Sequence, residues 1–125
     1  MREIKFRAWD KANNIWLDPD YFIICPDNGV VIKIDYDDDN GNLVLDQVDH
    51  EVILEQYTGL KDFNDVEICE GDILKDVDDS TIVGFVEYDK AFGEYDCGDN
   101  NLYECTRDCV VIGNIHEQPE LLEDK

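Results

Sequence analysis

The chain has 125 residues, of which 32 are acidic and 10 are basic, so its formal net charge at pH 7 is −22. This balance excludes direct, non-specific binding to nucleic acid or to an anionic membrane surface, because such binding depends on Lys and Arg side chains that neutralise phosphates. The length suits a single domain over residues 1–125, and a hydrophobic content of 43% is sufficient for a buried core.

Apolar and polar residues alternate with a period of two along most of the chain, which is typical of half-buried β-strands. In chain order, strands are predicted over residues 4–8, 15–17, 30–36, 43–45, 52–57, 73–74, 81–88, 102–105 and 109–115. Turn-forming residues lie between them at 10–14, 26–29, 37–42 and 57–60. A short C-terminal helix is predicted over 119–123, because Pro119 fits a first helical turn. The pattern predicts a mainly β protein of short antiparallel strands with barrel-like packing.

The basic residues are concentrated at the N-terminus, where four of the ten lie within residues 1–11. In an antiparallel sheet we expect these side chains to pair with acidic residues on neighbouring strands. The sequence contains no apolar run as long as a signal peptide or a membrane span. Its five cysteines are irregularly spaced and odd in number, which favours reduced thiols over a disulfide framework. We therefore expect a cytoplasmic protein.

The acidic segment Asp35–Gly41 matches a calcium-binding loop only in part. Such a loop needs oxygen ligands at positions 1, 3 and 5, Gly at position 6 and Glu at position 12. Counting from Asp35 puts Asn40 at the Gly position and Asp46 at the Glu position. Counting from the next residue puts Tyr36 at position 1. We interpret the segment as an acidic hairpin tip, and whether it binds a cation stays open.

The cysteines and histidines form no recognisable reactive motif. Cys105 and Cys109 have the spacing of one zinc knuckle, with Cys97 nearby, but a zinc ribbon needs two such pairs. We expect these cysteines to be buried as small apolar residues. His50 and His116 are distant from them in sequence, and no phosphate-binding loop occurs. The sequence therefore predicts no catalytic residue, no metal site, no cofactor and no enzymatic activity.

Three blocks of sequence resemble the YopX family of small phage and prophage proteins. They are Ile4–Lys11, Gln56–Asp62 running on to Glu70–Ile73, and Val111–Leu122, while Gly84–Asp89 is similar to the central strand of that family. The blocks span nearly the whole chain in the order expected for the family. The turn after Asp62 departs from the family, because Phe63-Asn64-Asp65-Val66 replaces the usual Asn-Gly.

The resemblance implies a β-rich, phage-encoded or prophage-encoded protein located in the cytoplasm of a bacterial host. It implies an N-terminal β-hairpin region over 1–56 and an SH3-like barrel region over 57–125. The family supplies no catalytic residues to carry over. The acidic clusters lie outside the shared blocks, so any function that they have is expected to be specialised.

Two classes of function are compatible with the acidic clusters. In the first, the protein mimics DNA and inhibits a basic, nucleic-acid-binding host protein such as a defence nuclease, in an anti-restriction or anti-CRISPR role. On a sheet, same-face carboxylates recur about every 6.8 Å along a strand and about 4.8 Å across strands, which approximates a phosphate backbone. The residues predicted to contact such a partner are Asp35, Asp37, Asp38, Asp39, Asp76, Asp78 and Asp79. In the second class, the protein is a structural or adaptor protein of phage replication or assembly, and its charge serves solubility only.

Overall fold

The computed structural model describes residues 4–37, 41–48 and 50–123. The chain forms two compact units. Unit 2 consists of Arg7–Leu54, and unit 1 consists of Met1–Phe6 together with Glu55–Lys125. Strand β6 (Val52–Lys61) begins in unit 2 and ends in unit 1. No helix of the described residues is long and apolar enough to cross a membrane.

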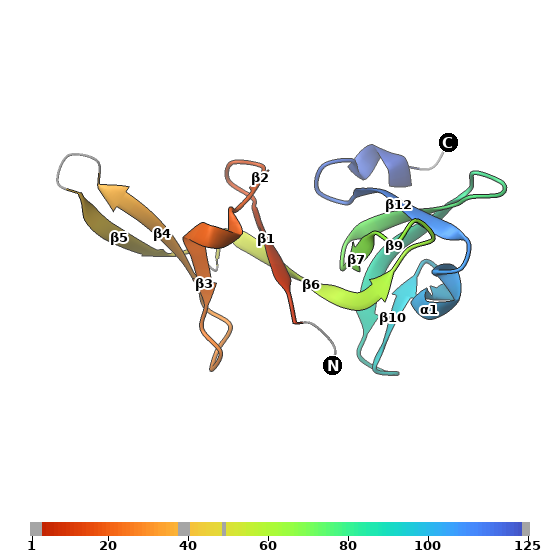
Figure 1. The fold of residues 1–125 in the computed structure, drawn as a ribbon, viewed down its shortest axis with the longest axis horizontal. Helices are drawn as coiled ribbons and strands as arrows, with labels where there is room; N and C mark the ends of the chain where they lie inside the picture. The colour runs from red at the N-terminus through yellow and green to blue at the C-terminus, as the bar shows by residue number, and fades with distance from the viewer. Residues whose placement is uncertain (1–3, 38–40, 49, 124–125) are drawn as a thin grey trace. The chain divides into compact units, whose positions relative to one another are not determined.

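Unit 2 contains an N-terminal hairpin and a three-stranded antiparallel sheet (Figure 1). Its elements are β1 (Phe6–Asp10), β2 (Ile15–Trp16), the 3-10 helix η1 (Pro19–Tyr21), β3 (Phe22–Ile24), β4 (Val31–Asp37) and β5 (Asn42–Gln47). The sheet has the order β3-β4-β5. Buried residues of the unit 2 core are Ala8, Leu17, Val31 and Val52, with Phe22, Ile24, Val48 and Leu54 packed against them.

The N-terminal hairpin follows the sequence prediction closely. The backbone of Asn14 has a φ of 55°, a left-handed conformation that Asn tolerates better than most residues. Trp9 and Trp16 lie opposite each other in register, and their rings make an edge-on contact at 4.9 Å. The guanidinium of Arg7 lies 4.3 Å from the Trp16 ring, so this basic residue is stabilised by a cation–π contact as well as by the sheet.

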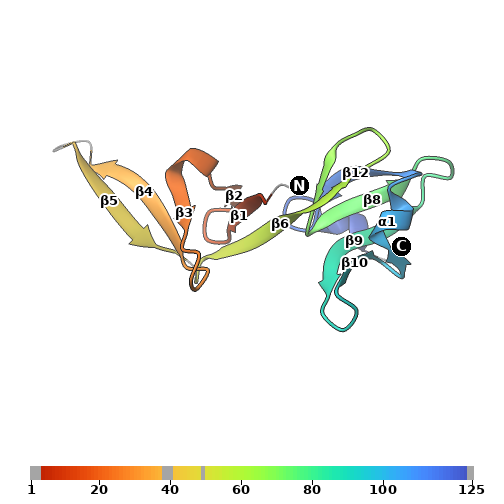
Figure 2. The same cartoon turned by 60° about the horizontal axis from the view of Figure 1, so that its bottom comes forward.

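Unit 1 is built on a five-stranded antiparallel sheet with the order β11-β10-β9-β8-β12 (Figure 2). Its further elements are β7 (Glu67–Cys69), β8 (Asp72–Asp76), β9 (Ile82–Asp89), β10 (Glu94–Cys97), β11 (Asn100–Asn101), α1 (Leu102–Cys105), β12 (Cys109–Asn114) and the 3-10 helix η2 (Pro119–Leu122). The core contains Ile68, Leu74, Val86, Cys97, Leu102, Cys105 and Cys109. The curled antiparallel sheet confirms the prediction of a mainly β, barrel-like fold.

Close backbone contact within this sheet requires glycine. Gly84 lies in β9 with a φ of 149°, and a Cβ atom there would lie 2.7 Å from the backbone nitrogen of Gly98. That distance is shorter than any normal carbon–nitrogen contact, so side chains at either position would force the strands apart. Gly84 interrupts the alternation of side chains along β9. The backbone of Gly98 occupies the space that a side chain at this position would take.

Three local predictions differ from the structure. Residues 102–105, predicted as a strand, form α1, because the Asn101 side chain accepts a hydrogen bond from the Tyr103 N–H and caps the turn. Leu102 and Cys105 then point into the core at helical spacing. The predicted bend at 57–60 lies inside β6, where the pairing with β7 is irregular. The predicted C-terminal helix is a single 3-10 turn.

Two side-chain pairs connect segments of unit 1 that are far apart in the sequence. Lys5 forms an ion pair of 2.7 Å with Glu67, which confirms for this residue the expected pairing with an acidic neighbour. His116 and Glu55, both almost fully buried, lie 3.0 Å apart. Their pairing spans 61 residues of sequence.

The carboxylate of Asp62 connects the end of β6 to β12. It is buried, and one oxygen accepts hydrogen bonds from the N–H groups of Asn64 at 2.8 Å and Val66 at 2.9 Å. The other oxygen accepts from the N–H of Val111 at 2.8 Å, which lies 49 residues away. A single carboxylate therefore closes the turn after β6 and holds that turn against the last strand.

We predict that Asp62→Asn lowers the free energy of unfolding by about 1–3 kcal/mol, because the amide NH₂ group replaces an acceptor and leaves a buried N–H without a partner. Asp65→Asn is the matched control, since Asp65 is exposed in the same turn and makes only a 3.9 Å ion pair with Lys61. Denaturant unfolding of both variants measures the difference. Equal stability of Asp62→Asn and the parent protein would contradict this account of Asp62.

Candidate functional site

The predicted acidic residues of unit 2 lie on and beyond β4. Asp35 is exposed within β4, where it pairs in register with Val44, and its carboxylate lies 3.7 Å from the Lys33 ammonium. Asp37 is the last residue of β4 and pairs with Asn42. Asp38 and Asp39 lie outside the described residues. The first part of the acidic segment is therefore strand and not loop.

The predicted acidic residues of unit 1 form the turn between β8 and β9. One carboxylate oxygen of Asp76 accepts hydrogen bonds from the N–H groups of Asp78 at 2.8 Å and Asp79 at 3.3 Å. Asp79 in turn accepts from the N–H of Thr81 at 2.9 Å. Hydrogen bonds from Thr81 lower the pKa of the Asp79 carboxyl. This cluster belongs to a different unit from Asp35, and two of its three carboxylates organise the turn.

Three potential metal ligands meet beside this turn. The ligand atoms of Asp76, Asp108 and Cys109 all lie within 4.8 Å of one another. Burial raises the pKa of the Cys109 thiol to about 12, so the thiol is protonated at neutral pH and donates to Asp108 across 3.5 Å. This hydrogen bond accounts for the contact between Cys109 and Asp108. Cys97, Cys105 and Cys109 are all buried, as predicted.

A more ordered group of carboxylates lies on the hairpin of β9 and β10. The register places Glu87 opposite Asp96 and Asp89 opposite Glu94. Residues two apart on a strand, and residues directly opposite across strands, share one face of a sheet. These four residues therefore form two consecutive acidic pairs on one face, which we call the carboxylate ladder.

The opposite face of the same hairpin is apolar and anchors it. Tyr88 lies opposite Tyr95, and their rings make an edge-on contact at 5.2 Å. The next pair, Val86 and Cys97, is fully buried in the core of unit 1. The carboxylate ladder is thus held on a hairpin whose other face is buried at Val86 and Cys97 and half exposed at Tyr88.

The electrostatics of the carboxylate ladder are unfavourable for folding. Acidic residues directly opposite each other on a sheet repel, and such pairs are destabilising. Burial, followed by the nearby charge of Asp89, raises the pKa of the Asp96 carboxyl. Two groups offset the repulsion: Glu94 accepts a 2.9 Å hydrogen bond from the Asn101 side chain, and Asp89 accepts one of 2.9 Å from the Ala91 N–H.

Sequence reasoning missed the carboxylate ladder, although a signal was present. The tripeptide Glu-Tyr-Asp occurs twice, at 87–89 and 94–96, on either side of a four-residue turn. Antiparallel pairing of two such copies puts acid opposite acid and tyrosine opposite tyrosine. The second copy went unrecognised because β10 is short and was not predicted as a strand.

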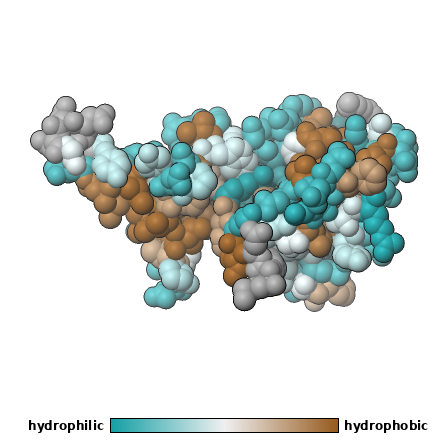
Figure 3. All heavy atoms as spheres, viewed as in Figure 1, coloured by the Kyte–Doolittle hydropathy of each residue, from teal (hydrophilic) through white to brown (hydrophobic). Residues whose placement is uncertain are grey.

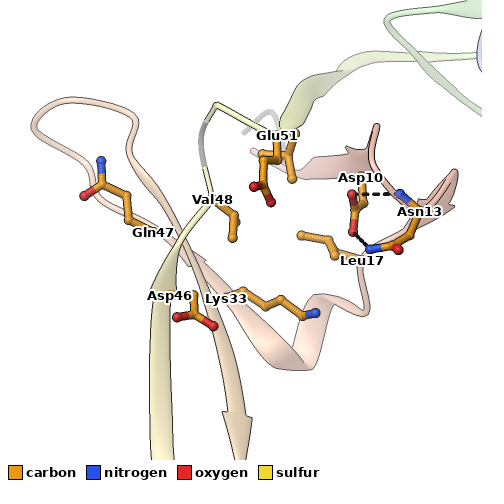
Figure 4. A pocket seen from close by; sticks show the side chains of 9 residues that line it. Asp10, Asn13, Leu17, Lys33, Asp46, Gln47, Val48 and Glu51 are labelled. Carbon is orange, nitrogen blue, oxygen red and sulfur yellow. Dashed lines mark hydrogen bonds between the residues drawn. The ribbon is translucent and has the colours of Figure 1, made fainter.

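Unit 2 contains a polar cavity of about 330 Å³ between its hairpin and its sheet (Figure 4). Carboxylates of Asp10, Asp46 and Glu51 line it together with the single ammonium of Lys33. The Asp10 carboxylate accepts hydrogen bonds from the Asn13 side chain at 2.8 Å and from the Ala12 N–H at 2.9 Å. The Asn13 side chain is the main cause of a lowered pKa at Asp10. Asp10 is therefore a structural residue of the β1–β2 turn.

Comparison with known proteins agrees with the resemblance of the sequence blocks. The family model described as YopX protein matches residues 5–123. The chain belongs to the YopX family. A crystal structure of protein EF1440 from Enterococcus faecalis is similar over 98% of this chain and 100% of that chain, with 28% sequence identity and a TM-score of 0.67. No curated protein matches the chain.

The position of the carboxylate ladder relative to the YopX-like blocks is informative. Glu87 and Asp89 lie within Gly84–Asp89, which resembles the central strand of the family. Glu94 and Asp96 lie outside the resembling blocks. Of the two opposing strands, only β9 therefore falls within a block by which the sequence resembles the family, while the family model matches both strands.

We predict that Asp96→Asn increases the thermal unfolding midpoint at pH 7. Because the pKa of Asp96 is raised in the folded protein, ionising it disfavours the fold at any pH above that pKa, and the penalty is absent below the ordinary value of 3.8. The difference from the parent protein should therefore be full at pH 7 and disappear towards pH 3.8. Asp99→Asn, in the exposed turn after β10, is the control and should change little. A variant less stable than the parent at pH 7 would refute the repulsion.

Proposed function

We propose that this YopX-family protein is a phage-encoded, non-enzymatic acidic binding protein that mimics DNA. Its partner would be a basic, nucleic-acid-binding protein of the host cytoplasm, such as a defence nuclease, in an anti-restriction or anti-CRISPR role. The observation that carries the proposal is the carboxylate ladder, with Glu87 opposite Asp96 and Asp89 opposite Glu94. A pattern that costs stability and is held in place by packing is more typical of a binding surface than of solubility.

The spacing of the carboxylate ladder supports recognition by a phosphate-binding groove. Same-face positions on a strand are about 6.8 Å apart and paired positions about 5 Å apart. Duplex DNA presents one charge per about 1.7 Å of axis over both strands, so two acidic pairs in register offer a comparable local density. The opposing strands of the hairpin also give two parallel rows of charge. Long-range attraction would speed association with a basic groove.

The clusters predicted from sequence are secondary candidates for contact with a partner, each within its own unit. Asp35, Asp37, Asp38 and Asp39 belong to unit 2, and Asp76, Asp78 and Asp79 belong to unit 1. Asp76 and Asp79 accept main-chain hydrogen bonds within their turn, as Asp89 does in the carboxylate ladder, so the ladder is distinguished by the pairing of acid opposite acid. We therefore place the carboxylate ladder ahead of the sequence-predicted residues as the proposed contact surface.

The alternative function, a structural or adaptor protein of phage replication or assembly, is favoured by a different observation. Several carboxylates, including Asp10, Asp62 and Asp76, accept main-chain hydrogen bonds at turns. These acids serve the fold, so part of the net charge needs no partner to explain it. The two functions differ in whether the exposed acids are needed for binding.

Binding of purified basic nucleases over a salt series separates the two functions. We expect affinity to fall at least about tenfold between 50 and 200 mM salt, because a partner with several charge contacts is screened. A variant with Glu87→Gln, Asp89→Asn, Glu94→Gln and Asp96→Asn should bind at least about tenfold more weakly than the parent. Duplex DNA should compete with the parent protein for the same nuclease.

The control variant removes the same number of charges elsewhere on unit 1, with Asp65→Asn, Glu104→Gln, Glu120→Gln and Glu123→Gln. All four of these residues are exposed and lie outside the carboxylate ladder. Equal loss of affinity in both variants would mean that only net charge matters. Affinity that is unaffected by salt and by the ladder variant would reject the mimic and favour the adaptor.

A further inference from the structure

One face of the β3-β4-β5 sheet in unit 2 is apolar and largely exposed, with Ile32 and Ile34 partly buried. The register pairs Ile23 with Ile32, Ile34 with Leu45, and Tyr36 with Leu43. Residues paired in this way share a face, so the six side chains form one continuous surface, which we call the apolar face. In the space-filling view, hydrophobic residues gather over β4 and β5 (Figure 3).

The exposure of the apolar face is large for a sheet. Ile23, Tyr36, Leu43 and Leu45 are 49%, 61%, 53% and 56% exposed. The opposite face of the same sheet is used differently, since Phe22, Ile24 and Val31 on that side pack in the unit 2 core. One face of the sheet is thus partly buried in the unit 2 core, at β3 and the start of β4, and the other face is apolar with four of its six side chains exposed.

The sequence of β4 is consistent with burial on both faces. Val30-Val31-Ile32-Lys33-Ile34 is almost continuously apolar, a pattern found in strands that are covered on both sides. A strand with one face in water normally alternates apolar and polar residues. The alternation of apolar and polar residues is therefore lost in this part of β4, although the unit 2 core covers only one of its two sides.

We propose that the apolar face is the interface of a homodimer, in which it packs against the same face of a second copy of this chain. The first argument is charge. Apart from the Tyr36 hydroxyl, none of the six side chains carries an ionisable group, although the chain has a net charge of −22. A second copy can therefore approach through this face without placing carboxylates against carboxylates. A basic partner would instead lose hydration of its Lys and Arg side chains against an uncharged surface.

The second argument is area. With large aliphatic and aromatic side chains about half exposed, the apolar face offers on the order of 500 Å², at the upper end of what monomers expose. Two such faces together bury about 1,000 Å², which is less than the about 1,200–2,000 Å² of stable interfaces and is the size of a weak one. The predicted dimer is therefore weak and concentration-dependent.

The third argument is geometry. Two twisted antiparallel sheets pack face to face about 10 Å apart with their strands nearly aligned, and a two-fold axis makes such a contact self-complementary. Asp35 and Asp46 lie on the side of the sheet opposite to the apolar face, as their pairing with Val44 and Lys33 requires. The contact would leave these carboxylates in solvent. The inference does not depend on the proposed mimicry of DNA.

Sedimentation equilibrium of the full chain tests the dimer, at about 0.15 M and about 0.5 M salt because added salt screens the repulsion between the two acidic copies. We expect the mass to rise with protein concentration from 14.5 kDa to twice that value, and more readily at high salt. Leu45→Asp should weaken association at least about tenfold, because it buries an unpaired charge in the interface. Leu45→Ala should weaken it less.

Val44→Asp is the matched control, because Val44 precedes Leu45 in β5 and lies on the opposite face with 38% exposure. It should leave the dimerisation constant within about threefold of the parent value. Circular dichroism verifies that each variant is folded, and Leu45→Ala replaces Leu45→Asp if the latter unfolds. A chain that stays monomeric at both salt concentrations overturns the proposal. So does a dimer that is insensitive to substitution of Leu45, or equally sensitive to Val44→Asp.

Discussion

Main-chain N–H groups at turns need acceptors, and in this acid-rich chain carboxylates supply many of them. Asp62 is the clearest case, since its two oxygens accept three N–H groups, one of them from Val111, which lies 49 residues along the chain. Asp10, Asp76 and Asp89 act in the same way within single turns. A charged acceptor forms stronger hydrogen bonds than a neutral one, so the sharp turns between short strands are stabilised by the same residues that make the chain acidic.

Some carboxylates also face one another across strands. In the carboxylate ladder, Glu87 lies opposite Asp96, while Asp89 both accepts the Ala91 N–H and lies opposite Glu94. Packing of Tyr88 on Tyr95 and burial of Val86 hold the hairpin in spite of this repulsion. The apolar face of unit 2 is a second feature that the isolated fold does not need. These two surfaces are the ones on which we propose contacts with other molecules.

Features that depend on neighbouring residues were predictable from sequence, and features that depend on register were not. The Asn13-Asn14 turn and the alternation of β9 are local, and both are present as predicted. The helix α1 was missed because four residues are too few for a helical period, and its stability comes from the Asn101 cap. The carboxylate ladder and the apolar face both require knowing which residue lies opposite which. The pairing of residues across strands is set by the turns and by packing in the core together.

The edge-on pair of Trp9 and Trp16 has a practical consequence for measuring this protein. These are the only two tryptophans of the chain, and both lie in unit 2. Their fluorescence therefore reports the environment of one unit, while the tyrosine pair Tyr88 and Tyr95 belongs to the other. Tryptophan emission and the circular dichroism of the whole chain can thus be followed separately during unfolding. Two non-coincident transitions would identify the units as independently cooperative, and coincident ones as a single cooperative structure.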